Sequence, residues 1–147
     1  MFAEFDESLF PIVCVKLSGS IDSQEDFDSF IGKWLEYYEN KKNFIFYFDT
    51  LDVTDPPLTY CFQMCSFIKK LRKKEYQYLQ KSILLINSNK IKWLLDFIFL
   101  IQPPVAPVYI YNVSYGISEN VESTIEIAMN HPETSKIQPS KPFLPLF

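Results

Sequence analysis

The segment Asn-Phe-Ile-Phe-Tyr-Phe-Asp, residues 43–49, organises the predicted fold. Five large apolar or aromatic side chains follow one another and end at Asp49. A strand that is apolar on both faces is normally covered on both faces, so we expect this one at the centre of a parallel or mixed sheet. A polar loop with two prolines follows at residues 50–58. Loops at the carboxyl ends of central strands often carry the sites of α/β proteins, so this loop is a candidate site.

Strand and helix patterns alternate on both sides of this segment. Apolar runs predict strands at residues 12–17, 82–86 and 108–111, and an acidic, aromatic segment at 2–10 predicts an edge strand. Apolar residues at spacings of three and four predict helices near residues 22–38, 59–74, 90–101 and 118–129. We therefore predict one α/β domain over residues 1–130, with a mixed, mostly parallel sheet of four to five strands and about four helices. The helices cover either mostly one face of the sheet or both faces. Residues 131–147 read as a proline-rich extended tail.

Composition favours a globular protein of a reducing compartment. The chain has 147 residues, with 14 Phe, 9 Tyr and only 3 Gly, which argues against disorder and against a loop-rich disulfide scaffold. The odd number of cysteines, three, also disfavours a disulfide framework. No signal-peptide pattern and no long apolar segment is present. We expect a soluble, cytoplasmic protein without a transmembrane segment.

Charge is distributed unevenly along the chain. Residues 1–55 carry 12 acidic and 4 basic residues, a net charge of −8, whereas residues 56–147 carry 6 acidic and 10 basic residues, a net charge of +4. The basic run at residues 69–74 is short and the pI is near 5.0. These two features argue against a nucleic-acid partner.

The sequence offers little for catalysis. Nucleophilic catalysis by a thiol needs a neighbouring base, and the single histidine, His131, stands at the start of the predicted tail. Cys61 and Cys65 belong to a helical apolar stripe, where packing is the expected role, and two thiolates alone make a poor zinc site. No glycine-rich phosphate loop is present. We expect a protein that is not an enzyme and holds no metal or cofactor.

The end of the central strand carries three carboxylates, those of Asp49, Asp52 and Asp55. Such a group could bind a divalent cation. Turn and capping roles are the alternative that the loop spacing favours.

The third predicted helix, residues 90–101, has more apolar side chains than one buried face requires. Ile91, Leu94, Leu95 and Ile98 suffice for the core, yet Trp93, Phe97, Phe99 and Leu100 cover other sides. Such a helix is either buried all round by the sheet, its neighbour helix and the tail, or it contacts something beyond its own domain. Trp93, Phe97 and Leu100 are therefore candidate contacts for a second copy, a protein partner or a lipid, with the basic residues 69–74 at the rim.

Three segments carry a resemblance to known families. They are the strand at 12–17 followed by Ser-Gly-Ser-Ile-Asp, the strand at 44–49 ending in Asp, and Ser-Ile-Leu-Leu-Ile-Asn at 82–87 followed by a helix and two prolines. Over roughly residues 8–130 the chain resembles STAS domains, also called anti-sigma-factor-antagonist-like domains, and the topologically similar CRAL-TRIO-like domains.

The resemblance to STAS domains implies a non-catalytic regulatory or structural module that acts through protein–protein contacts, with a protein partner or a homodimer. The resemblance to CRAL-TRIO domains implies the alternative, a domain that binds a lipid or another small apolar ligand. Regulatory STAS domains carry a phosphorylatable Ser after an Asp at the start of the helix that follows the central strand. Here Asp55 is followed by Pro56, and Thr54 and Thr59 lie on either side. Asp49, Asp55 and Thr59 are the corresponding candidate site residues.

Overall fold

The predicted central segment lies in strand β3 (Phe44–Val53) of a computed structural model, which describes residues 2–139. Strand β3 pairs in parallel with β2 (Ile12–Gly19) on one side and with β4 (Leu79–Ile86) on the other. In this register Phe46 lies opposite Val13 of β2 and Ser82 of β4. The predicted central position of this strand is thus confirmed.

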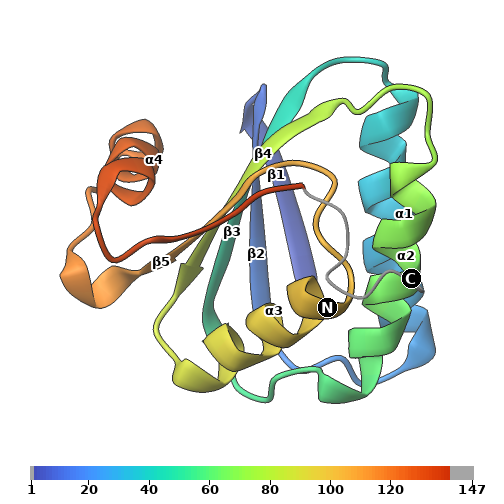
Figure 1. Ribbon diagram of the computed structural model, residues 1–147, viewed down its shortest axis with the longest axis horizontal. Coiled ribbons are helices and arrows are strands. Elements are labelled where there is room, and N and C mark those ends of the chain that lie inside the picture. Colours follow the sequence, from blue (N-terminus) through green and yellow to red (C-terminus); the bar gives the residue numbers. More distant parts are fainter. Residues whose placement is uncertain (1, 140–147) are drawn as a thin grey trace.

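The six strands lie in the sheet in the order in which they occur along the chain (Figure 1). Strand β1 (Ala3–Leu9) forms one edge and is antiparallel to β2. Strand β5 (Val108–Asn112) is parallel to β4, and β6 (Ser135–Ile137) forms the other edge, antiparallel to β5. The predicted mixed sheet with a parallel centre is confirmed.

The sixth strand, β6, lies in the segment that the sequence predicted as an extended tail. It has three residues and places Ile137 opposite Val108 of β5. Ile137 packs against the main core, but three residues are too few to show the alternation of apolar and polar side chains that identifies a strand in a sequence. Residues 140–147 of the predicted tail lie outside the described part of the chain.

Three helices cover one face of the sheet, and the fourth lies on the other face (Figure 1). Helices α1 (Gln24–Glu39), α2 (Cys61–Arg72) and α3 (Asn89–Ile101) each connect two parallel neighbouring strands. Right-handed crossovers between strands in sequential order place every connecting helix on the same face. Helix α4 (Val121–Asn130) connects two antiparallel strands, so the crossover rule does not determine the face on which it lies. Of the two predicted arrangements, helices mostly on one face is correct.

Local sequence explains where these elements begin. Ser23 caps α1 by accepting a hydrogen bond from the Asp26 amide at 3.2 Å, and Ser88 caps α3 in the same way. Gly19 ends β2 with a φ of 68°, a conformation that glycine adopts without strain. Two short 3₁₀ turns, η1 (Leu58–Tyr60) and η2 (Val113–Tyr115), precede α2 and follow β5.

An aromatic cluster fills the space between the sheet and the three helices. Trp34 of α1 lies with its ring 4.8 Å from that of Phe46 and 5.3 Å from that of Phe67 of α2. Phe46 is completely buried. Large edge-to-face rings therefore join α1, α2 and the central strand into one core.

The opposite face of β3 is only partly covered. Phe44, Phe46 and Phe48 are buried beneath the helices, whereas Ile45 and Tyr47 on the other face are half-buried. Helix α4 packs mainly against β4 and β5, and Tyr47 and Leu51 of β3 pack partly buried against the same apolar cluster. The second face of the central strand is therefore covered in part, because one ten-residue helix is too small to cover a six-stranded sheet.

Candidate functional site

Helix α3 presents a stripe of apolar side chains to solvent. Trp93 and Leu100 are 61% and 63% exposed, and Phe97 between them is half-buried. Positions 93, 97 and 100 share one side of a helix, while Ile91, Leu94 and Ile98 are buried on the other. Trp93 and Leu100 thus lie at the surface. This position agrees with the alternative in which the helix contacts something beyond its own domain.

Phe62 of α2 extends this stripe across the neighbouring helix. Its side chain is 66% exposed, and its ring meets Phe97 edge-on with centroids 6.0 Å apart. Phe97 in turn stacks on Trp93 at 5.7 Å with an angle of 12° between the rings. We call Phe62, Trp93, Phe97 and Leu100 the aromatic patch. Sequence analysis missed Phe62, although a phenylalanine outside the apolar stripe of its helix was a usable signal.

An apolar seam between α2 and α3 lies beneath the aromatic patch. Cys61, Cys65 and Ile68 of α2 pack against Leu94 and Ile98 of α3. The Cys65 Sγ lies 3.6 Å from the Ile98 carbonyl oxygen, to which it can donate a weak hydrogen bond. Burial, with a smaller contribution from Cys61, raises the pKa of the Cys65 thiol to about 11. The thiol therefore stays protonated at neutral pH and serves the packing of the two helices.

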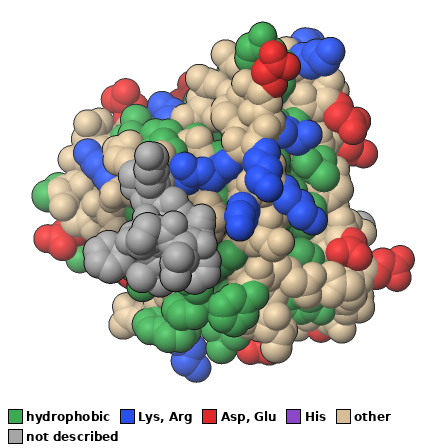
Figure 2. Space-filling model, turned by 45° about the vertical axis from the view of Figure 1, so that its right-hand side comes forward, with side chains coloured by type: hydrophobic (Ala, Val, Ile, Leu, Met, Phe, Trp, Pro, Cys, Tyr) green, Lys and Arg blue, Asp and Glu red, His purple; other side chains and the backbone are tan. Residues whose placement is uncertain are grey.

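The C-terminal end of α2 is basic. Lys69, Lys70, Lys73 and Lys74 are exposed, and within residues 2–139 none of them forms an ion pair. Arg72 donates a hydrogen bond to the Pro103 carbonyl at 3.3 Å, which ties this end of α2 to the segment after α3. Figure 2 shows Lys and Arg side chains gathered at the centre of this side of the molecule, with hydrophobic side chains below them.

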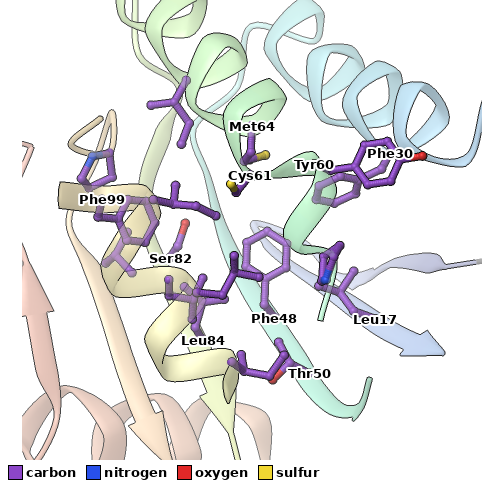
Figure 3. Close-up of a pocket in the computed structure, with 18 of the residues that line it drawn as sticks. Leu17, Phe30, Phe48, Thr50, Tyr60, Cys61, Met64, Ser82, Leu84 and Phe99 are labelled. Carbon is purple, nitrogen blue, oxygen red and sulfur yellow. The ribbon is translucent and has the colours of Figure 1, made fainter. Parts of the chain in front are cut away.

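A cavity of about 150 Å³ lies beneath the helices, between α1, α2, α3 and the sheet. Its lining is almost entirely apolar; Phe48, Leu84, Met64 and Phe99 surround it (Figure 3). Trp34 also lines the cavity, and its buried Nε1 has no hydrogen-bond partner among the described residues.

The acidic residues near the end of β3 have separate local roles. Asp49 accepts a hydrogen bond from the Leu51 amide at 2.9 Å, and Asp52 pairs with Lys16 at 3.1 Å. Asp55 is exposed in the loop that leads to α2, as is Thr59 in η1. The described residues contain no group of three or more His, Cys, Asp or Glu side chains placed to hold a metal ion.

The single histidine lies far from the buried cysteines. His131 stacks on Tyr115 and meets the ring of Tyr111, on the α4 side of the sheet. Cys61 and Cys65 lie on the opposite side, in the seam between α2 and α3. The structure therefore does not bring this imidazole together with either of these two thiols.

The chain matches no protein-family model, no curated protein and no solved structure. The resemblance to STAS and CRAL-TRIO domains stays a prediction from the sequence. Among residues 2–139, no helix has the length and apolar character needed to cross a membrane.

Proposed function

We propose that this protein is a non-catalytic interaction module that binds a protein partner through the aromatic patch. The observation that carries the proposal is the contact of three rings from two helices, at 6.0 and 5.7 Å, in which Phe62 and Trp93 are each more than 60% exposed. The STAS-like features of the sequence point to the same class of function.

The energetics of burial favour this use of the patch. Removing one large apolar side chain from water contributes roughly 1.5–3 kcal/mol, so the patch can supply most of a binding free energy. Aromatic side chains are also the usual anchors of protein interfaces. The packed seam beneath the patch holds Phe97 in place before a partner arrives, which reduces the entropy lost on binding.

Selection from a displayed library of random 16-residue peptides tests this proposal. We expect the wild-type protein to enrich peptides that no longer bind the double variant Phe62→Gln/Trp93→Gln. Because both side chains are exposed, this variant keeps its fold, with a change in unfolding free energy of about 0.5 kcal/mol per site or less. Urea unfolding, monitored by circular dichroism, measures this change in unfolding free energy.

The matched control is Tyr76→Gln, since Tyr76 is 64% exposed but belongs to the segment after α2. The control should bind the selected peptides as the wild type does. Sedimentation velocity over a range of concentrations reports whether a second copy occupies the patch instead. Peptide binding that survives in the double variant, without patch-dependent self-association, would refute the proposal.

The cavity supports a second candidate function, the binding of a small apolar ligand. Its volume of about 150 Å³ lies well below the roughly 300–1,000 Å³ of drug-sized ligand pockets. An engineered apolar cavity of about this size binds benzene. The volume therefore favours a single-ring molecule over a lipid.

Thermal unfolding with phenol, benzene and a long-chain fatty acid tests this second candidate. A ligand that binds only the folded state raises the midpoint of unfolding, and we expect phenol and benzene to do so but not the fatty acid. Ala106 lines the cavity, and Ala106→Leu should reduce the shift by filling it. If phenol raised the midpoint of unfolding equally in the wild type and in this variant, phenol would bind outside the cavity.

A further inference from the structure

The outer side of α2 changes from aromatic to basic along a single stripe. Phe62, Ser66, Lys69 and Lys73 follow one another at spacings of four, three and four residues, and all are exposed. Residues at such spacings lie on the same side of a helix. At about 1.5 Å per residue, Lys69 and Lys73 lie roughly 10 to 17 Å along the helix from Phe62.

Helix α3 follows the same direction beside this stripe. Phe62 meets Phe97, Cys65 reaches the Ile98 carbonyl, and Arg72 reaches the Pro103 carbonyl. Later positions on α2 thus contact later positions on α3 and then the segment that follows α3. The aromatic patch therefore lies near the start of α2, and the lysines of α2 lie at its other end. Figure 2 shows basic side chains above hydrophobic ones on one side of the molecule.

The charge at the basic end is not compensated within the described residues. Lys69, Lys70, Lys73 and Lys74 form no ion pair with another residue of the range 2–139, whereas Lys16, Lys33 and Lys92 each pair with a carboxylate. Four like charges within six residues repel one another, and an anionic partner would relieve this repulsion.

The partner must be narrow, because the rest of the chain is acidic. Residues 1–55 carry a net charge of −8, and α1, which belongs to this part, lies in the same helix layer as α2. An extended anionic surface such as a membrane or a nucleic acid would approach these acidic residues as well. A single peptide segment can contact α2 and α3 without contacting α1.

Resting on the proposed function, we infer that the partner is an acidic protein segment with an aromatic or leucine anchor. The anchor packs on the aromatic patch, and Asp or Glu side chains reach Lys69 and Lys73. The separation of roughly 10 to 17 Å sets the spacing in the partner. It corresponds to about seven to eleven residues in a helix or about three to five residues in an extended strand.

Charge reversal in the peptide selection tests this inference. The wild-type protein should enrich peptides that combine an aromatic or leucine residue with acidic residues at one of these spacings. The variant Lys69→Glu/Lys73→Glu should instead enrich peptides with basic residues at the same positions. The matched control Lys42→Glu/Lys136→Glu makes the same change in net charge at two exposed sites outside α2, and should still select acidic peptides.

Affinity measurements on one selected peptide give a second readout. Two exposed ion pairs contribute together about 0.4–2 kcal/mol, so Lys69→Gln/Lys73→Gln should weaken binding roughly 2- to 30-fold. Raising the salt concentration from 50 to 500 mM should weaken the wild type but have little effect on this variant.

The two proposals fail in different ways. Peptides that require Phe62 and Trp93 but carry no acidic residues, and bind equally well at both salt concentrations, would overturn the acidic partner and leave the proposed function standing. Selected peptides that bind equally well after Phe62→Gln/Trp93→Gln would overturn both.

Discussion

Cys65 illustrates at the residue scale how burial determines what a side chain can do. A thiolate is required for reaction with thiol reagents, and burial raises the pKa of Cys65 to about 11. Cys61 is buried in the same seam, whereas Cys14 on β2 is half-exposed. Burial, and to a smaller extent Asp6, also raises the pKa of the Cys14 thiol, so Cys14 differs from the two buried cysteines mainly in its exposure.

We expect Ellman's reagent to label Cys14 alone in the native protein and all three thiols in denaturant. The variant Cys14→Ser should then show no rapid labelling. Cys65→Ser should lower the free energy of unfolding by about 1–3 kcal/mol, because a hydroxyl replaces a buried thiol. Rapid labelling of Cys61 or Cys65 in a folded protein would contradict a packing role.

The raised pKa of Tyr38 predicts that the protein loses stability at alkaline pH. Its side chain is buried, its hydroxyl donates a hydrogen bond to Gln77 at 2.7 Å, and burial raises its pKa to about 12. The unfolded chain releases this proton near pH 10. The folded state therefore binds the proton more tightly, and the free energy of unfolding falls as the pH rises from about 10 to 12.

Urea unfolding at a series of pH values checks this prediction, with Tyr38→Phe as the comparison. The variant should lose less stability than the wild type between pH 9 and 11. Burial and the hydrogen bond to Glu7 also raise the pKa of Tyr37, so Tyr37→Phe should act in the same direction. Parallel pH profiles for the wild type and both variants would exclude this linkage.

At the scale of the element, strand β3 has one buried face and one half-buried face. Adjacent residues on this strand therefore make a matched pair. Phe46 is completely buried under the helices, so Phe46→Ala should cost about 3–5 kcal/mol of unfolding free energy. Ile45 is half-buried on the opposite face, and Ile45→Ala should cost about 1–2 kcal/mol. Urea unfolding measures both, and equal costs would mean that something covers the second face in solution.

At the scale of the whole molecule, strand order converts the charge asymmetry of the sequence into a spatial one. Because the strands occur in sequential order, residues 1–55 build one side of the sheet and later residues the other. The basic end of α2 lies where these two parts meet, and Lys74 lines the same pocket as Glu39 of α1. Such a charge distribution can steer and orient a charged partner before contact.

A local basic surface on α2 predicts binding to a narrow anionic chain, such as a single heparin chain, in spite of the net charge of −4. We expect retention on a heparin column at pH 7 and low salt, and its loss in Lys69→Gln/Lys73→Gln. The control Lys42→Gln/Lys136→Gln has the same net charge and should elute with the wild type. Equal elution of the two variants would mean that net charge alone governs retention.

Sequence patterns anticipated the parts of the site that depend on one helix. The excess of apolar side chains at residues 90–101 singled out Trp93, Phe97 and Leu100, since helical spacing alone shows that one face cannot bury them all. The same reasoning could not reach Phe62, because its contact with Phe97 depends on how α2 and α3 pack. The resemblance to STAS domains grouped Asp49, Asp55 and Thr59, whereas in the structure Asp49 accepts a hydrogen bond from the Leu51 amide within β3, and Asp55 and Thr59 are exposed.

The sequence by itself determined the order of the elements, the central position of β3 and the unusual composition of α3. These features follow from local periodicity, capping residues and the burial that a continuous apolar run demands. Only the tertiary structure decided which face the helices cover, where β6 pairs, and how a cavity and an aromatic patch arise. Those features depend on crossover handedness and on contacts between residues distant in the chain, which no single segment of sequence records.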